Sequence, residues 1–282
     1  MANIHLIIGS CPKPFIDKFD TIQQNAIGSW SAATHPSVTK SIYLMGNESG
    51  TEQAAAMYGC TYVPDIEYNT FGTPLVSSIF NRLKEIGSQT TVSPDTKIVY
   101  CYINCDIIIF DEFLTNIVAY HSNDISDTPL PYLLVGTRWD IDGIGKIDFN
   151  RDDWATTVRR YSLATGSSHS YGGIDYFIYG PNTFKYIYPF ALGKFVWDQW
   201  LVGNVYRKDS ITVDISLTNL VLHQNGDWYQ SCSGGCTTDR KALYQTEEVK
   251  INDSFDYYRK DIFTGTRYES SLVDSAIVYA KK

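Results

Sequence analysis

The first 110 residues alternate between short apolar runs and amphipathic segments, and this alternation restricts the fold more than any other feature of the chain. Strand-like runs occur at residues 4–9, 41–46, 60–66 and 97–109. Helical spacing of apolar residues, or helix-capping punctuation, separates them at residues 14–33, 47–59 and 73–87. Strands that alternate with helices pair in parallel, because each helix returns the chain to the same edge of the sheet. The sequence therefore predicts an α/β fold whose parallel sheet has helices on both faces.

One acidic residue interrupts the fourth strand-like run. Asp106 follows Asn104 and Cys105 inside the apolar text "KIVYCYINCDIIIF". An unpaired buried carboxylate is costly, so Asp106 is expected at a strand end, where it is paired or bound to a cation. Ligands of such sheets bind at the carboxyl ends of the strands. Asp106 is therefore a candidate ligand-binding residue; the alternative is a strand-end acid that only accepts hydrogen bonds from loop amides.

The second half of the chain is expected to complete the same domain. Residues 132–142 look like a strand, a Gly172–Gly173 turn leads into an aromatic strand, and residues 197–206 look helical. Residues 211–230 look like a strand followed by an ordered loop, and the text after that is mixed, polar and expected to end in short helices. No internal repeat or low-complexity linker divides residues 1–282, so a single domain is predicted.

Composition excludes several classes of protein. The net charge is −8 and the isoelectric point is near 5.1, which argues against a nucleic-acid-binding surface. No apolar run approaches the ~20 residues that span a bilayer, and the N-terminal text lacks the basic region of a signal peptide. The cysteines Cys11, Cys60, Cys101 and Cys105 are expected to be reduced. Free thiols are also favoured over a local disulfide for Cys232 and Cys236, and a cytoplasmic location follows.

Six short motifs occur in an order that resembles a known superfamily. They are "FGTPL" (71–75), "NCDI" (104–107), "RWD" (138–140), "GGIDYF" (172–177), "PFALGKFVWDQW" (189–200) and "HQN" (223–225). This order resembles GT-A-type glycosyltransferases, the nucleotide-diphospho-sugar transferases, over about residues 1–255. The resemblance implies a GT-A (Rossmann-like) α/β fold with a central mixed, mostly parallel sheet flanked by helices.

The resemblance also implies an activity and a division of the chain. The expected reaction is metal-dependent transfer of a sugar from a nucleotide-diphosphate donor, a UDP-sugar by resemblance, to a hydroxyl of a glycan or glycoprotein acceptor. Residues 1–110 would form the nucleotide-sugar-binding half, residues 130–255 the acceptor and catalytic half, and residues 256–282 a C-terminal helical tail. Two departures leave the acceptor open: Lys194 stands where Arg is common, and Gly226 to Gln230 replace His-Asp-Tyr-Ser-His.

The metal is expected at Asp106. Mn²⁺ or Mg²⁺ prefers hard oxygen ligands and keeps phosphate oxygens and water in its shell, so one protein acid can suffice. In the resembling enzymes a late histidine completes the shell, a role that falls on His223 here. Asn104 would contact the ribose or a metal-bound water. The alternative for His223 is a core histidine hydrogen-bonded to backbone.

Two acids compete for the role of general base. Asp198 lies between Trp197 and Trp200, and partial desolvation would raise its pKa and make it a better proton acceptor. An acid at this landmark is the base of inverting relatives; the alternative is a helix N-terminal acid favoured by the helix dipole. Asp175 is the rival base, or it accepts sugar hydroxyls. Gly173, beside it, would let backbone approach the ligand, unless the two glycines form a plain turn.

The remaining expected contacts are to the donor. Ile8, Gly9 and Ser10 end the first strand and are expected to meet the nucleobase and ribose. Arg138 would bind the diphosphate and Asp140 the donor hydroxyls; the alternative is an internal ion pair of Arg138 with Asp140 or Asp142.

Two other functions remain open from the sequence. A nucleotidyltransferase uses a related sheet, but "GSCPKPF" lacks its glycine-rich loop. The second is a catalytically inactive carbohydrate-binding protein, which the sequence does not exclude.

Overall fold

The computed structural model describes residues 2–226, 246–255, 258–274 and 276–282. The first half contains β1 (Asn3–Ser10), α1 (Asp17–Ala32), β2 (Val38–Met45), α2 (Thr51–Tyr58), β3 (Thr61–Val63), α3 (Val76–Gln89), β4 (Thr96–Ile103), β5 (Ile107–Ile108), α4 (Asp111–His121) and the 3₁₀ helix η1 (Asp124–Asp127). Every strand and helix that periodicity predicts in residues 1–110 is present. The fourth predicted strand is divided, because a turn at residues 104–106 separates β4 from β5.

The second half contributes β6 (Tyr132–Val135), β7 (Trp139–Ile141), α5 (Trp154–Thr165), β8 (Ser167–Ser168), β9 (Tyr176–Tyr179), α6 (Trp197–Tyr206), β10 (Ile211–Asp214), β11 (Leu222–Gln224), α8 (Glu247–Phe255), α9 (Ile262–Gly265), β12 (Tyr268–Val273) and β13 (Ala276–Lys281). The predicted helix at residues 197–206 has the bounds of α6. The predicted strand at residues 132–142 is divided between β6 and β7, which belong to different sheets.

The main sheet has the strand order β13-β12-β10-β6-β9-β4-β1-β2-β3. Neighbouring strands from β3 to β4 are parallel, as are β6, β10 and β12. Strand β9 runs antiparallel between β4 and β6, and β13 runs antiparallel at one edge. The predicted α/β fold with a central mixed, mostly parallel sheet flanked by helices is therefore confirmed.

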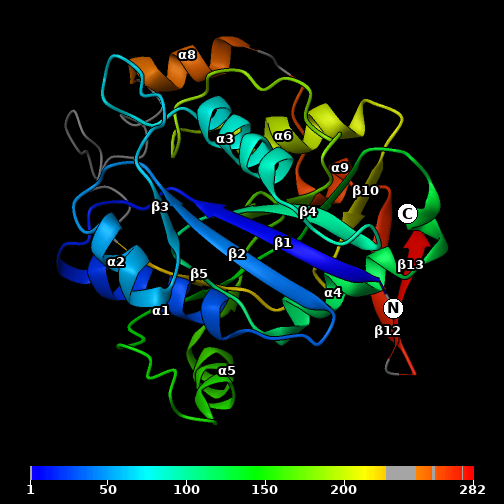
Figure 1. Ribbon diagram of the computed structural model, residues 1–282, viewed down its shortest axis with the longest axis horizontal. Coiled ribbons are helices and arrows are strands. Elements are labelled where there is room, and N and C mark those ends of the chain that lie inside the picture. The colour runs from blue at the N-terminus through cyan, green and yellow to red at the C-terminus, as the bar shows by residue number, and fades with distance from the viewer. Residues whose placement is uncertain (1, 227–245, 256–257, 275) are drawn as a thin grey trace.

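Side chains of β1 alternate between the two faces of this sheet, as a strand period of two requires. Leu6 and Ile8 pack in one buried core with Trp30 of α1, whereas Ile7 packs in a second core with Leu83 of α3. Figure 1 shows the same division, with α1 and α2 on one face of the sheet and α3 and α6 on the other. The helices thus cover both faces of the main sheet and do not cover the ends of its strands.

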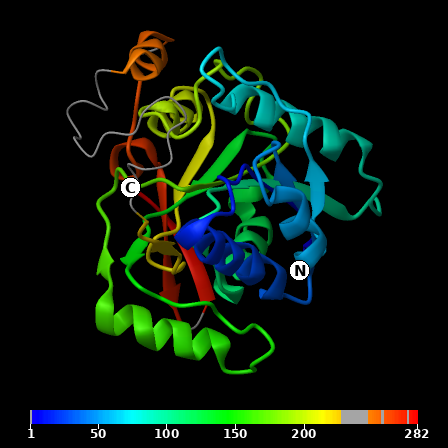
Figure 2. The ribbon, with the colours of Figure 1, turned by 90° about the vertical axis from the view of Figure 1, so that its left-hand side faces the viewer.

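A second, smaller sheet has the strand order β5-β11-β7-β8. In it His223 of β11 pairs with Ile107 of β5 on one side and with Asp140 of β7 on the other. Helix α5 packs against β7, and Figure 2, like Figure 1, places α5 at the end of the molecule opposite α8. The small sheet therefore brings three distant motifs to the turn that follows β4.

The predicted helical tail at residues 256–282 is wrong for most of its described part. Only α9 is helical there, and β12 and β13 form an antiparallel hairpin with Asp274 at its turn. Strand β12 pairs in parallel with β10 and so extends the main sheet. The run Ile277-Val278-Tyr279 has the β-branched and aromatic residues that strands favour, and pairing with β12 outweighs the polar composition of the segment.

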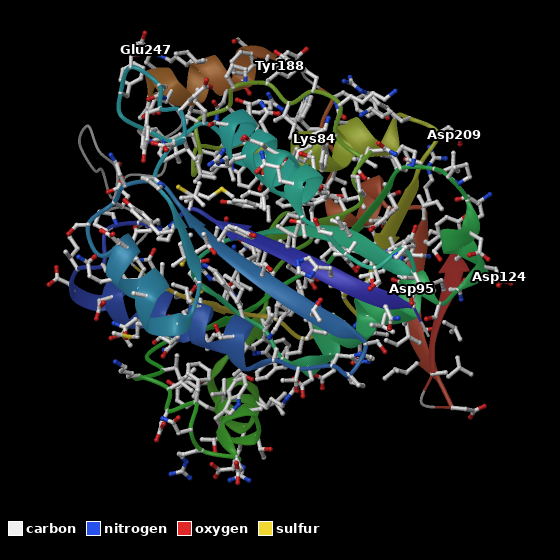
Figure 3. The ribbon with its side chains drawn as sticks, in the orientation of Figure 1. Lys84, Asp95, Asp124, Tyr188, Asp209 and Glu247 are labelled. Carbon is white, nitrogen blue, oxygen red and sulfur yellow. The ribbon has the colours of Figure 1, made fainter. Side chains whose placement is uncertain are left out.

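The described surface agrees with the composition. Exposed acidic side chains are spread over several sides of the molecule, as Asp95, Asp124, Asp209 and Glu247 illustrate in Figure 3. Cys11, Cys60, Cys101 and Cys105 are free thiols, as predicted, whereas Cys232 and Cys236 lie outside the described residues. None of the described helices is both long and apolar enough to cross a bilayer.

Gly9 offers a test of the packing between β1 and α3. A Cβ atom at Gly9 would lie 2.6 Å from a methyl carbon of the fully buried Leu83. We expect Gly9→Ala to lower the free energy of unfolding by about 1–3 kcal/mol through overpacking, and Leu83→Ala by about 2–5 kcal/mol through a cavity. Because the added methyl would occupy part of that cavity, the double variant should lose less than the sum in urea unfolding. Strict additivity would contradict this packing.

Candidate functional site

The candidate site begins at the turn between the two sheets. The backbone N–H of Asn104 donates to the carbonyl of Asp175 at 2.9 Å, and the Ile107 N–H donates to the carbonyl of Asn104 at 3.2 Å. These bonds end β4 and place Asp106 just beyond its carboxyl end, between β4 and β5. The predicted strand-end position of Asp106 is therefore observed.

Asp106 and His223 face each other at this turn. Nε2 of His223 lies 3.6 Å from Oδ2 of Asp106, which is longer than a hydrogen bond. The His223 side chain is fully buried and that of Asp106 is 17% exposed. Oδ1 of Asp106 is buried and has no hydrogen-bond partner among the residues that the structure describes. A buried carboxylate oxygen of this kind requires a further partner.

The other ring nitrogen of His223 is held by Asp140. Nδ1 of His223 lies 3.0 Å from Oδ1 of Asp140 and 3.1 Å from Oδ1 of Asn225. Burial would lower the pKa of His223, but the adjacent Asp106 and Asp140 carboxylates raise it to about 9. An Nδ1–H that donates to Asp140 directs Nε2 toward Asp106.

Asp140 accepts hydrogen bonds from three side chains. Besides His223, Nε of Arg138 donates to Oδ1 at 3.0 Å, and Nδ1 of His169 donates to Oδ2 at 2.6 Å. Burial acts to raise the pKa of Asp140, but the hydrogen bonds from His223 and His169 and the charge of Arg138 hold it below its ordinary value. Asp140 thus stays ionised and connects the two histidines to the arginine.

Arg138 connects this group to the second acid of the site. One of its terminal nitrogens donates to Oδ2 of Asp175 at 2.6 Å, and Asn104 donates to Oδ1 of Asp175 at 2.8 Å. The internal pair of Arg138 with Asp140, which the sequence left as an alternative, is therefore present; no pair with Asp142 is seen in the described residues. Both oxygens of Asp175 already accept hydrogen bonds.

Asp198 lies in the first turn of α6, where it is partly exposed. Oδ1 accepts a hydrogen bond of 2.8 Å from the Gln199 N–H. Burial raises the pKa of Asp198 to about 7, and the charge of Asp175 acts in the same direction. Val196, the residue before α6 and two residues before Asp198, has φ 85°, a left-handed conformation that is strained for a β-branched side chain. Strained backbone thus lies at the start of the helix that carries the acid.

The predicted nucleobase contacts lie inside the sheet. Ile8 and Ser10 are at most 1% exposed, and Gly9 packs against Leu83. Gly173 is also buried, and a Cβ atom there would lie 2.3 Å from the His169 ring, so the glycine makes room for His169. For these four residues donor contact stays a prediction.

The "HQN" motif holds the turn against α1. The Gln224 N–H donates to the carbonyl of Asp106 at 3.1 Å, and the Gln224 amide donates to the carbonyl of Ile22 at 2.9 Å. Asn25 of α1 donates to the Gln224 amide oxygen at 2.9 Å. The motif therefore supplies both the histidine that faces Asp106 and the contacts that fix the Asp106 backbone.

A pocket opens beside Asp106. It is lined by Lys13, Phe19, Ile22, Asp106, Gln224 and Gly226. Another pocket, on the α3 face of the sheet, contains none of the candidate site residues; it is lined by Phe80, Asn81, Lys84, Tyr100, Tyr179, Pro181, Phe184, Tyr186 and Ile187.

The donor atoms at Asp106 suit a divalent cation only as an open site. In the described residues no three His, Cys, Asp or Glu side chains form a group that could hold a metal ion. Asp106 nevertheless has one carboxylate oxygen, Oδ1, without a hydrogen-bond partner in the described residues, and its other oxygen, Oδ2, lies 3.6 Å from Nε2 of His223. This pair fits a Mn²⁺ or Mg²⁺ that takes its other ligands from phosphate oxygens and water.

The sequence did not indicate two members of the site. His169 is a lone histidine in the polar text "SSHSYGG", and only the pairing of β8 with β7 brings it to Asp140. Lys13 stands between two prolines in "CPKPF", and this rigid context is the one sequence feature that could have indicated a site residue. Trp228 and Tyr229, which follow the "HQN" motif in the sequence, lie outside the described residues.

Comparisons with known proteins give low similarity throughout. No protein-family model and no curated protein matches the sequence. S. aureus TarS 1-349 with UDP-GlcNAc aligns with a TM-score of 0.47 at 10% identity, over 86% of this chain and 64% of that chain. A second structure of the same region gives a TM-score of 0.44 at 12% identity, over 80% and 58%. The chain thus spans less than two thirds of these TarS structures.

A third solved structure covers a larger share. Glucosyl-3-phosphoglycerate synthase from Mycobacterium tuberculosis, in complex with Mg²⁺ and uridine diphosphate, aligns with a TM-score of 0.45 at 11% identity, over 100% of this chain and 87% of that chain.

The burial of Arg138 leads to a prediction about the free energy of unfolding. We expect Arg138→Met to lower the free energy of unfolding by about 3–5 kcal/mol, because Asp140 and Asp175 would keep their charge without its partner. Arg151→Met is the matched control, since Arg151 pairs with Asp153 at the exposed surface and should show little change. Urea unfolding followed by circular dichroism measures both. If both variants lost a similar amount of unfolding free energy, the buried ion pairs of Arg138 would be no more important for stability than the exposed pair of Arg151.

Proposed function

We propose that this chain is a metal-dependent glycosyltransferase that moves a sugar from a nucleotide-diphosphate donor, a UDP-sugar, to a hydroxyl of a glycan or glycoprotein acceptor. The observation that carries the proposal is the approach of Asp106 and His223 at the carboxyl end of β4. The ordered motifs of the sequence support it, because four of them, "NCDI", "RWD", "GGIDYF" and "HQN", contribute to one hydrogen-bonded group around this point.

The metal position follows from the charge of the leaving group. Transfer releases a nucleoside diphosphate, and a divalent cation held by Asp106 and His223 would supply the positive charge that stabilises it. Asp140 fixes the orientation of His223 through Nδ1. Asn104, which donates to Asp175, holds that carboxylate in place beside Arg138.

The general base in this proposal is Asp198. It takes the proton of the acceptor hydroxyl while that oxygen bonds to the donor sugar and the bond to the diphosphate breaks, with inversion at the anomeric carbon. A carboxylate with a pKa of about 7 is well matched to this task near neutral pH. Asp175 is less suited to it, because Arg138 and Asn104 occupy both of its oxygens.

The arrangement of the chain supports one catalytic domain. The main sheet is continuous from the first strands to β13, so residues 1–282 are proposed to act as a unit. Residues 1–110 provide the turn and, together with Gln224 and Gly226, the lining of the pocket on the donor side. Residues 130–255 provide Arg138, Asp175 and Asp198 on the acceptor side.

Removal of the Asp106 carboxylate tests the metal role. We expect Asp106→Asn to weaken UDP binding in the presence of Mn²⁺ by more than about 100-fold, since even outer-shell partners of a metal are worth about 10–100-fold. Isothermal titration of UDP with and without Mn²⁺ measures the effect. Asp95→Asn is the control. Asp95 is exposed and is labelled in Figure 3, and this variant should bind UDP as the unchanged protein does.

The same titration separates the proposal from other functions. Affinity for UDP that does not depend on Mn²⁺ would remove the metal role of Asp106. Binding of glycans without any response to nucleotide and metal would instead indicate a carbohydrate-binding protein.

Removal of the Asp198 carboxylate tests the base. We expect Asp198→Asn to keep donor binding and to lose about 10²–10⁴-fold in the rate of transfer. In the unchanged protein the rate should fall tenfold per pH unit below about pH 7, where Asp198 becomes protonated, and should level off above it. A transfer assay across pH 5.5–8.5 measures both effects.

Asp175→Asn is the comparison for this experiment. It should change donor or acceptor binding and leave the pH profile in place. A profile that disappears in the Asp175 variant and persists in the Asp198 variant would assign the base to Asp175.

A further inference from the structure

The pocket beside Asp106 contains a lysine that the proposed mechanism does not use. Lys13, in the loop between β1 and α1, lines this pocket together with Asp106, Phe19 and Ile22. The last residues of β1, Ile8 to Ser10, are buried in the sheet, and Cys11 and Pro12, which begin the loop, are also buried. Lys13 is therefore the first residue after β1 whose side chain borders both the pocket and the candidate metal position.

The sequence around Lys13 makes its backbone rigid. Pro12 and Pro14 stand on either side, and each proline fixes its own φ and keeps the residue before it extended. Gln23 of α1 adds two hydrogen bonds: the Lys13 N–H donates to its side-chain oxygen at 2.7 Å, and its amide donates to the Lys13 carbonyl at 2.9 Å. The Gln23 side chain is itself almost fully buried. The position of the Lys13 backbone is thus set before any ligand arrives.

The charged end of Lys13 lies within electrostatic range of the site. Its Nζ is 5.0 Å from the centre of the Phe19 ring. Lys13 and Asp106 both line the same pocket, so their opposite charges border one small volume. Lys13 therefore offsets part of the negative charge that Asp106 brings to the pocket.

A polyanion is the ligand class that this arrangement suits. Lysine binds phosphate as a mobile point charge, and a cation at Asp106 would bind the same group from its other side. The apolar side chains of Phe19 and Ile22 line the pocket next to these charges. We propose that Lys13 binds the diphosphate of the donor nucleotide, an inference that rests on the proposed function.

Titration of UDP and uridine in the presence of Mn²⁺ tests this role. Lys13→Gln should weaken UDP binding by about 10- to 100-fold, the loss of one hydrogen bond to a charged group. Uridine, which has no phosphate, should bind the variant as it binds the unchanged protein. Lys13→Arg should keep most of the affinity for UDP. Lys18→Gln, an exposed change in the nearby α1, is the matched control and should leave both affinities within about twofold.

Gln23→Leu tests the positioning of the lysine, since it removes both hydrogen bonds at nearly constant volume. If Gln23 acts through Lys13, this variant should lose affinity for UDP and keep affinity for uridine. A purely structural role would lower both affinities together.

The outcomes separate the inference from the proposed function. If the unchanged protein binds neither UDP nor uridine, the proposed function fails, and the role of Lys13 fails with it. If it binds UDP and Lys13→Gln binds UDP equally well, only the role of Lys13 is overturned. Equal losses of UDP and uridine affinity in Lys13→Gln would also overturn it, because they would show support of the pocket instead of phosphate contact.

Discussion

The hydrogen bonds to Asp140 are the interaction on which the rest of the site depends. This one carboxylate accepts from Arg138, His169 and His223, and through Arg138 it is connected to Asp175 and Asn104. Burying charged groups is costly unless each has a partner, so removal of the Asp140 carboxylate would take a partner from Arg138, His169 and His223 at once. The small sheet makes this pairing feasible, because β7 lies between β8 and β11 and presents Asp140 to a histidine on each side.

Local sequence pattern predicts those strands and helices of this chain whose formation depends on neighbouring residues in the sequence. The strands and helices of residues 1–110 follow from periodicity and capping, and so do the bounds of α6, because each buries one face against the same sheet. The small sheet does not follow from pattern. Its strands have two or three residues, too few for a period, and they pair over long separations, such as the 83 residues between Asp140 and His223. The C-terminal hairpin pairs locally, but the polar composition of its segment hid the strands, and its parallel pairing with β10 joins it to the main sheet.

The residues of the candidate site also fall into those that local sequence indicates and those that only the fold brings together. Asp106 is recognisable because a carboxylate interrupts an apolar strand, which is a local contradiction that needs a chemical explanation. His169 has no such signal: only the fold shows that it donates to Asp140. The roles of Arg138 and Asp175 were left open because a salt bridge and a ligand contact use the same residue types. Their mutual hydrogen bond at 2.6 Å favours a supporting role for both over direct chemistry.

An acidic protein that binds a polyanion must concentrate positive charge at one place. The net charge of this chain is −8, and Arg138, the cationic side chain of the "RWD" motif, already pairs with Asp140 and Asp175. Its charge is largely balanced within the protein and adds little to the attraction of a diphosphate. Under the proposed function, the negative charge of a bound nucleotide would be met in part by Lys13 and by a cation that enters with the ligand. Nucleotide affinity would then depend on metal concentration, because the cation and the diphosphate neutralise part of each other's charge.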